Sequence, residues 1–274
     1  MKKGFSFATW VMIGGFIFLY LPMLLMVIYS FNESRLVTVW SGFSAKWYVE
    51  LFKDEQMLGA IWLSLRVAFC SAWMAVILGT LAAFVMVRFG RFRGHTLFSG
   101  MITAPLVMPE VITGLSLLLL FVSMGQILGF PQQRGMMTIW IAHTTFCTAY
   151  VAVVVNSRLR EMDISFEEAA QDLGAKPLKV FFVITLPLIA PALVSGWLLA
   201  FTLSLDDLVI ASFVSGPGAT TLPMVVFSSV RLGVSPKINA LATLIILVVT
   251  FFVFLTWWYA RRVEKRDRQL MRAG

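Results

Sequence analysis

Three carboxylates occupy positions in apolar segments where a charged side chain is costly. Glu110 lies inside one long apolar run, and Asp206 and Asp207 stand at the end of another. An acid within a membrane span predicts a function, because its burial in lipid is expensive unless it faces a cavity, water or a partner. Together the three side chains would form an anionic lining suited to a cationic solute. A structural interpretation is equally open, in which Glu110 pairs with Arg66 and the aspartates lie in water.

Other kinds of chemistry find little support in the sequence. His95 and His143 are isolated, and Cys70 and Cys147 lack a partner at metal-ligand spacing, so we predict no metal site. The glycine-rich segment 216–218 lacks the lysine of a phosphate-binding G-x-x-x-x-G-K loop. We therefore expect neither catalytic residues nor ATP hydrolysis in this chain.

One long polar stretch, residues 158–187, has the features of ordered helical structure. Ser165 and Glu168 have the spacing of a capping box, which predicts a helix start. Gly174 predicts a left-handed helix end, and Pro177 suits the first turn of a second helix. The stretch therefore predicts two helices joined by a glycine turn. The residues alone leave open an ordinary capped helix hairpin or a DNA-binding helix-turn-helix.

The composition places these residues in a membrane protein. The chain has 274 residues, of which 59% are hydrophobic and 13% charged, about half the charged fraction of a soluble domain. Its mean hydropathy is +0.86. Six apolar runs are long enough to span a bilayer. We expect these spans at 7–29, 59–87, 97–122, 136–156, 187–205 and 238–260.

Two segments allow more than one interpretation. Residues 7–29 could belong to a signal peptide, but no small-residue cleavage site follows them, so we predict a retained first helix. Residues 208–230 are apolar and interrupted at 216–218, so that neither half could span a bilayer. This segment could form a helix in an outer loop or a partly inserted lid.

Lysine and arginine predict the orientation of the chain. If the N-terminus is inside, the inner segments hold fifteen of these residues and the outer segments hold six. This asymmetry places both termini and the 158–187 stretch in the cytoplasm, and it accounts for the net charge of +8 without nucleic acid. Without a long linker, we expect one six-helix unit over 1–274.

The polar stretch also carries a family resemblance. It matches the pattern EAA-x3-G-x9-I-x-L-P in full, through Glu168, Ala169, Ala170, Gly174, Ile184, Leu186 and Pro187. This pattern is similar to the cytoplasmic loop of permease subunits in binding-protein-dependent ABC importers. The resemblance implies an all-α membrane protein with the type I ABC importer permease fold. It also implies that the loop is the coupling helix that docks on the ATPase subunit.

Further segments resemble polyamine permeases, and in particular those of putrescine importers. These are 103–109 with Glu110, 205–213 and 215–231. Family members carry aspartate or glutamate after the Met-Pro pair, so Glu110 is a mild departure. The resemblance implies an importer of polyamines, putrescine first, whose pathway includes Glu110, Asp206 and Asp207.

The resemblance further implies a system of several parts in the bacterial inner membrane. A periplasmic polyamine-binding protein would deliver the solute, a second homologous permease would complete the pathway, and two ATPase subunits would hold ATP and Mg²⁺. This chain would hold no cofactor. The alternatives are an importer for another solute such as spermidine, or an ion-driven secondary transporter. For Arg66 an ion pair, a snorkelling residue and a gate element all remain open.

Overall fold

The computed structural model describes residues 7–36, 39–90, 92–233 and 235–273. Contacts divide the chain into two compact units, one of residues 59–227 and the other of 1–58 with 228–274. Each unit is described by itself. The prediction of a single domain over 1–274 stays a prediction.

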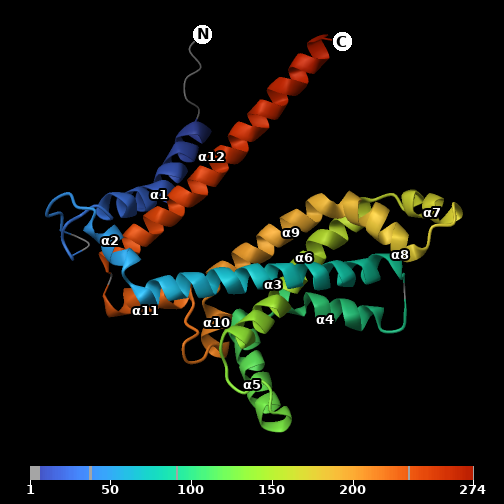
Figure 1. Ribbon diagram of the computed structural model, residues 1–274, viewed down its shortest axis with the longest axis horizontal. Helices are drawn as coiled ribbons and strands as arrows, with labels where there is room; N and C mark the ends of the chain where they lie inside the picture. The colour runs from blue at the N-terminus through green and yellow to red at the C-terminus, as the bar shows by residue number, and fades with distance from the viewer. Residues whose placement is uncertain (1–6, 37–38, 91, 234, 274) are drawn as a thin grey trace. The chain divides into compact units, whose positions relative to one another are not determined.

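The described residues form helices and no β-strand, as expected of an all-α protein (Figure 1). The first helices are α1 Phe7–Tyr29, α2 Lys46–Phe52, α3 Glu55–Arg88, α4 His95–Val107, α5 Glu110–Leu128 and α6 Met136–Glu161. They are followed by α7 Ser165–Asp172, α8 Pro177–Val180, the π-helix η1 Phe181–Thr185, α9 Leu186–Asp206, α10 Val209–Val214, α11 Leu222–Leu232 and α12 Pro236–Ala273.

Six helical segments in the described residues are long and apolar enough to cross a membrane, which confirms the predicted number. They are Phe7–Tyr29, Glu55–Arg88, Glu110–Leu128, Met136–Glu161, Pro177–Asp206 and Pro236–Leu255. Two of the six begin ten or more residues from the predicted start. The third was expected at 97–122, and the fifth was expected to begin at 187.

The third predicted span is broken in the middle. The helix α4 ends at Val107, and α5 begins at Glu110 after Met108 and Pro109 in extended conformation. Proline has no N–H and disfavours helical geometry in the residue before it, which separates the two helices. The break was predicted, but the span is α5, and Glu110 begins that helix instead of lying in its middle.

The fifth span extends further towards the polar stretch than predicted. A continuous helical path runs from Pro177 through η1 into α9. Pro187 lacks the N–H that would bond to the carbonyl of Val183, and the wider π turn of η1 lies next to this position. The helix thus passes through its prolines with a local change of winding instead of stopping.

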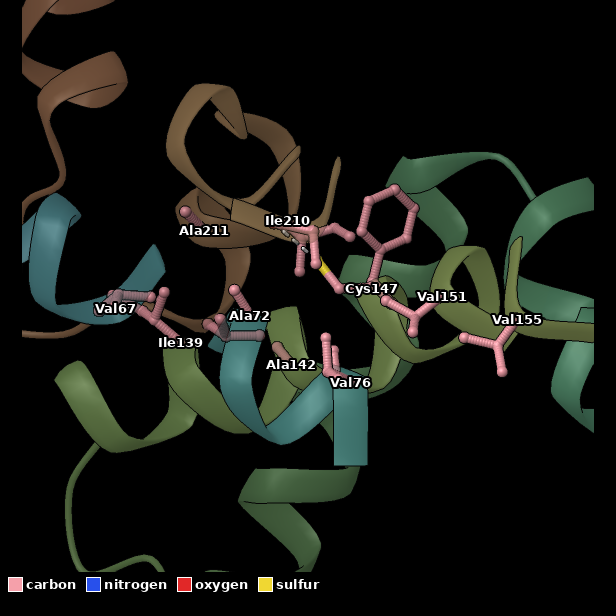
Figure 2. Close-up of a cluster of buried hydrophobic side chains, with 14 of the residues drawn as sticks. Val67, Ala72, Val76, Ile139, Ala142, Cys147, Val151, Val155, Ile210 and Ala211 are labelled. Carbon is pink, nitrogen blue, oxygen red and sulfur yellow. Dashed lines mark hydrogen bonds between the residues drawn. The ribbon is translucent and has the colours of Figure 1, made fainter. Parts of the chain in front are cut away.

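The core of unit 59–227 includes buried side chains of α3, α6, α9 and α10, and those labelled in Figure 2 come from α3, α6 and α10. A Cβ atom at Gly79 of α3 would lie 2.8 Å from Val151 of α6, and one at Gly196 of α9 would lie 3.3 Å from the same valine. Membrane helices pack through such small residues because the backbones can then approach closely. The two glycines therefore set how near α3 and α9 come to α6.

The other unit pairs the first and last helices. In Figure 1, α1 and α12 run side by side, and α2 packs on α12. Between α1 and α2, the buried side chain of Asn32 bonds to the backbone of Val39 and Ser41. The indole N–H of Trp47 donates to the Asn32 carbonyl at 2.6 Å. These bonds hold Asn32 against residues 39–41 and against the start of α2.

The charges of α3 bracket a stretch of bilayer length. Between Arg66 and Arg88 lie 21 uncharged residues, which cover about 32 Å at about 1.5 Å per residue. A bilayer core is about 30 Å thick. Arg66 and Arg88 therefore lie about one bilayer thickness apart along α3, and residues 56–65 before Arg66 are also uncharged. The sequence analysis placed Arg66 inside a span of 59–87.

Candidate functional site

The polar stretch folds as the predicted helix, glycine turn and second helix. Gly174 has a φ of +82° and ends α7. Its N–H donates to the Gln171 carbonyl at 2.8 Å, and the Ala175 N–H donates to the Ala170 carbonyl at 3.0 Å. This pair of bonds defines a Schellman motif, which favours glycine at the left-handed position. Pro177 begins α8, also as predicted.

The start of α7 differs from the prediction. No side chain caps this helix in the manner of a capping box, because Ser165 is its first helical residue and Ile164 is the N-cap. Instead, Asp163 Oδ1 accepts the Ser165 N–H at 2.9 Å. That backbone hydrogen bond lowers the pKa of the Asp163 carboxyl. The sequence pattern thus located the helix start correctly but assigned the wrong acceptor.

The residues of the EAA pattern lie on two different kinds of surface. Glu168, Ala169 and Gly174 are exposed, and Ala170 is half-buried. Around them the apolar side chains of Ile164, Phe166, Leu173 and Leu178 are also exposed, with 91% of Leu173 accessible. An exposed apolar patch of this kind marks an interaction surface.

The last three positions of the pattern belong to the transmembrane path. Ile184 lies in η1, and Leu186 and Pro187 begin α9. Ile184 and Leu186 are half-buried, and Pro187 is exposed. The pattern therefore joins an exposed polar helix to the point where the winding of a membrane helix changes.

A residue that the sequence analysis did not single out holds this region together. Glu167 is the one buried residue of α7. Its carboxylate lies 3.0 Å from Nε of Arg88 and accepts a 2.9 Å hydrogen bond from the Thr185 hydroxyl. We call Arg88, Glu167 and Thr185 the Glu167 cluster. Two features of the sequence could have indicated this cluster. Glu167 lies beside the pattern residue Glu168, and Arg88 lies at the end of an apolar run.

The three predicted pathway acids are not equivalent in the structure. Glu110 is exposed at the first turn of α5, where the positive end of the helix dipole favours a carboxylate. Among the described residues it forms no ion pair with Arg66, so that alternative was wrong. Asp206 is exposed at the end of α9.

Asp207, in contrast, is buried and engaged. Its Oδ2 accepts the Ala211 N–H at 2.7 Å, and its Oδ1 accepts the Ile210 N–H at 3.3 Å. The carboxylate thus satisfies donors at the start of α10, in the manner of a helix cap. The alternative in which both aspartates lie in water was therefore wrong for Asp207.

A buried histidine, His143, lies next to the Asp207 carboxylate. Nε2 of His143 lies 3.1 Å from Asp207 Oδ2, although not in hydrogen-bond geometry, and Nδ1 lies 2.7 Å from the Ser204 hydroxyl. His143 is 1% exposed. We call His143, Ser204 and Asp207 the Asp207 cluster. No periodic relation between the residues of α6 and those at the end of α9 could have predicted this cluster.

The segment after Asp207 is built into the core of its unit. α10 packs on α5 and α6, with Ile210 and Val214 fully buried. Gly216 has no room for a side chain, because a Cβ there would overlap the Arg134 carbonyl. The Leu222 N–H then donates to Ser64 of α3 at 2.8 Å. The first half of 208–230 is therefore a packed helix, neither a free loop helix nor a lid.

The fold and the polar loop define a permease subunit. Residues 75–269 match the family described as binding-protein-dependent transport system inner membrane component, and the chain belongs to this family. It is a multi-pass protein of the bacterial inner membrane. A bacterial ABC transporter that imports the acidic polysaccharide alginate contains a chain of similar fold, with a TM-score of 0.68 and 17% identity, over 91% of this chain and 92% of that one. A methionine ABC transporter, MetNI, gives a TM-score of 0.59 with 16% identity over 73% and 92%. The fold is the type I ABC importer permease fold.

Named relatives cover nearly the whole chain. The putrescine transport system permease protein PotI of Escherichia coli K12 is 68% identical over 96% of this chain and 95% of its own length. The spermidine/putrescine transport system permease protein PotC is 40% identical in the same strain, over 92% and 95%. The PotC protein of Haemophilus influenzae is 42% identical over 96% and 97%.

Proposed function

We propose that this chain is a permease subunit of an ATP-driven importer of polyamines, with putrescine as its preferred solute. The observation that carries the proposal is the 68% identity to a putrescine permease over 96% of the chain. The exposed carboxylates Glu110 and Asp206 suit a diammonium solute, because each would attract one positive charge. A pair of opposite charges 4 Å apart is worth about 4 kcal/mol at an effective dielectric constant of 20, before desolvation.

The partners follow from the same family. Importers of this kind work with ATPase and solute-binding subunits. For this chain we propose a second homologous permease, two ATPase subunits that hydrolyse ATP, and a periplasmic polyamine-binding protein. The exposed patch around Glu168, Ala169, Ala170 and Gly174 is the proposed docking face for the ATPase. This arrangement requires both termini and α7 in the cytoplasm, in agreement with the distribution of lysine and arginine.

Spermidine is the second candidate solute. Relatives at 40–42% identity are named for both spermidine and putrescine. The Asp207 carboxylate already accepts two backbone hydrogen bonds, so it is less available to the third amine of spermidine than Glu110 or Asp206 would be. For this reason we place spermidine after putrescine.

The test is ATP-dependent uptake of labelled putrescine by the purified complex in proteoliposomes, with unlabelled spermidine as competitor. We expect uptake that requires ATP and the binding protein and that spermidine inhibits weakly. Uptake of spermidine in preference to putrescine would shift the proposal to the second candidate. A complex that hydrolyses ATP in response to a different solute would remove the polyamine assignment altogether.

A further inference from the structure

The short helix α7 is attached to its unit through one charged side chain. Of its eight residues, Ser165–Asp172, Glu167 alone is buried. The neighbouring apolar side chains of Phe166 and Leu173 point away from the core, with 57% and 91% of each exposed. The helix packs on α8 and η1. A displacement of α7 therefore passes to the membrane helices through Glu167, through the packing on α8 and η1, and through the chain on either side.

The contacts of Glu167 join three segments that are distant in sequence. Oε1 accepts hydrogen bonds from Nε and Nη2 of Arg88, each at 3.2 Å, while Oε2 lies 3.0 Å from Nε. The Thr185 hydroxyl donates to Oε1 at 2.9 Å. The side chains of Arg88 and Glu167 are 11% and 8% exposed. One carboxylate thus links the end of α3, the middle of the polar loop and the last residue of η1.

The electrostatics of the cluster make the link stiff. Arg88 ends α3, where a cation is favoured by the helix dipole, and Glu167 lies in the first turn of α7, where an acid is favoured. An ion pair held by several hydrogen bonds at low exposure is strongly disfavoured from separating, because each partner alone would remain a poorly solvated charge. We therefore expect Arg88, Glu167 and Thr185 to move together, with the ion pair between Arg88 and Glu167 intact.

Thr185 attaches the Glu167 cluster to the point where the winding of the membrane helix changes. It is the last residue of the π-helix, where the winding changes between α8 and α9. π turns in membrane helices are places where the backbone can readjust its hydrogen bonds. Through Thr185, a shift of α7 reaches this point of α9, and through Arg88 it reaches α3.

We infer that Glu167 is a positioning residue that transmits displacement of the coupling helix to α3 and α9 at the same time. The inference rests on the proposed function, in which α7 docks on the ATPase. Glu168 contacts the partner in this scheme, whereas Glu167 faces its own chain and determines whether the docked helix moves the membrane helices.

The test compares Glu167→Gln with Glu161→Gln in the complete reconstituted complex. Glu161 is a matched control because it also pairs with an arginine, Arg158, but at 3.5 Å and with 64% of its side chain exposed. We expect Glu167→Gln to assemble and to hydrolyse ATP, while the solute transported per ATP falls by about tenfold or more. Glu161→Gln should keep the wild-type ratio. A wild-type ratio in Glu167→Gln would overturn the inference.

A charge exchange protects the test against loss of assembly. Arg88→Glu or Glu167→Arg alone places like charges together and should abolish coupling. The two changes combined should recover part of the transport per ATP, because the opposite charges face each other again. Equal defects in the single and double variants, at equal amounts of assembled complex, would contradict a role for this pair.

A second readout is independent of the solute. Spin labels at Phe89→Cys and Asp172→Cys, both exposed positions, report the distance between the end of α3 and α7 in the assembled complex. Exposed Cys70 is replaced by serine beforehand. We expect a narrow distance distribution in the wild type and in Glu161→Gln, and a broad one in Glu167→Gln. A narrow distribution in all three would overturn the inference, whereas absence of putrescine uptake by the wild type would overturn only the proposed function.

Discussion

Two pairs of adjacent acids, Asp206-Asp207 and Glu167-Glu168, repeat one arrangement in different parts of the chain. In each pair one carboxylate is exposed, and the other is buried and bonded within its own unit. The partners of the buried members differ. The hydrogen bonds that Asp207 accepts come from backbone N–H groups of α10, with the His143 ring 3.1 Å away, whereas Glu167 binds the side chains of Arg88 and Thr185. A capping acid fixes a local turn, while an acid bound to distant side chains connects helices.

From this difference we propose separate tasks within each pair. The exposed Glu168 and Asp206 are free to meet a partner subunit or a solute, and the buried members support the fold around them. Changes at Asp207 and Ser204 test that division directly, whereas changes at Gly174 and Asp54 test the proposed docking face and a more exposed ion pair.

Gly174→Asp should remove coupling while leaving the protein in the membrane. A side chain at a φ of +82° strains the end of α7, and the carboxylate adds charge to the proposed docking face. We expect uptake to fall by about 10- to 100-fold, with ATP hydrolysis no longer responsive to the binding protein. Gly129→Asp is the control, because Gly129 has a φ of +69° at the end of α5, away from the polar loop. Equal losses in both variants would attribute the effect to backbone strain alone.

Asp207→Ala should destabilise the protein more than Asp206→Ala. Removal of the Asp207 carboxylate leaves the N–H groups of Ile210 and Ala211 without acceptors in a buried site. We expect a loss of about 2 kcal/mol in the free energy of unfolding. Asp206→Ala should remain within about 0.5 kcal/mol of the wild type. Thermal unfolding in detergent measures both, and equal stabilities would remove the distinction between the two aspartates.

Ser204→Ala should have a smaller effect within the same cluster. The Ser204 hydroxyl is the hydrogen-bond partner of His143 Nδ1 at 2.7 Å, and its loss leaves a buried ring nitrogen unsatisfied. We expect a loss of about 1 kcal/mol. Ser195→Ala is the matched control on α9, because the exposed Ser195 donates only to the Pro191 carbonyl of its own helix. A larger loss in Ser195→Ala would contradict a supporting role for the Asp207 cluster.

Asp54→Asn should show the smallest effect, because its ion pair is more exposed than that of Glu167. The Met57 N–H, followed by the Lys237 ammonium at 3.0 Å, lowers the pKa of Asp54. A lowered folded-state pKa contributes stability above the unfolded pKa of about 3.9, and this contribution is lost as pH falls through the folded value. We expect the free energy of unfolding of the wild type to exceed that of Asp54→Asn by about 0.5–1 kcal/mol at pH 7, and by less at pH 4. An advantage that grows towards pH 4 in unfolding experiments would contradict the sign.

The sequence predicted much of this architecture for physical reasons. Long uncharged runs gave the six spans, and Gly174 and Pro177 gave the helical hairpin, because a glycine helix end and a proline helix start are local properties. Prolines 105 and 109 predicted a break. They did not show that the span itself would begin at Glu110, since hydropathy is similar on both sides of the break.

The tertiary partners of the acids could not be predicted in the same way. Glu167 and Arg88 are 79 residues apart, and His143 and Ser204 are 61 apart. Apart from the EAA pattern, which includes Glu168 but not Glu167, nothing local distinguishes Glu167 from Glu168, or Asp206 from Asp207. The distinction appears only when α3, α6 and α9 are packed together, because packing decides which of two adjacent side chains faces the protein.

The most direct test of the account is the KM for ATP-dependent putrescine uptake in three variants of the reconstituted complex. Glu110→Gln and Asp206→Asn remove exposed charges, and Asp207→Asn removes a buried one. We expect a raised KM with unchanged thermal stability for the first two variants, and lowered stability with a near wild-type KM per folded complex for Asp207→Asn. A raised KM at unchanged stability in Asp207→Asn, with wild-type kinetics in the other two, would contradict this expectation.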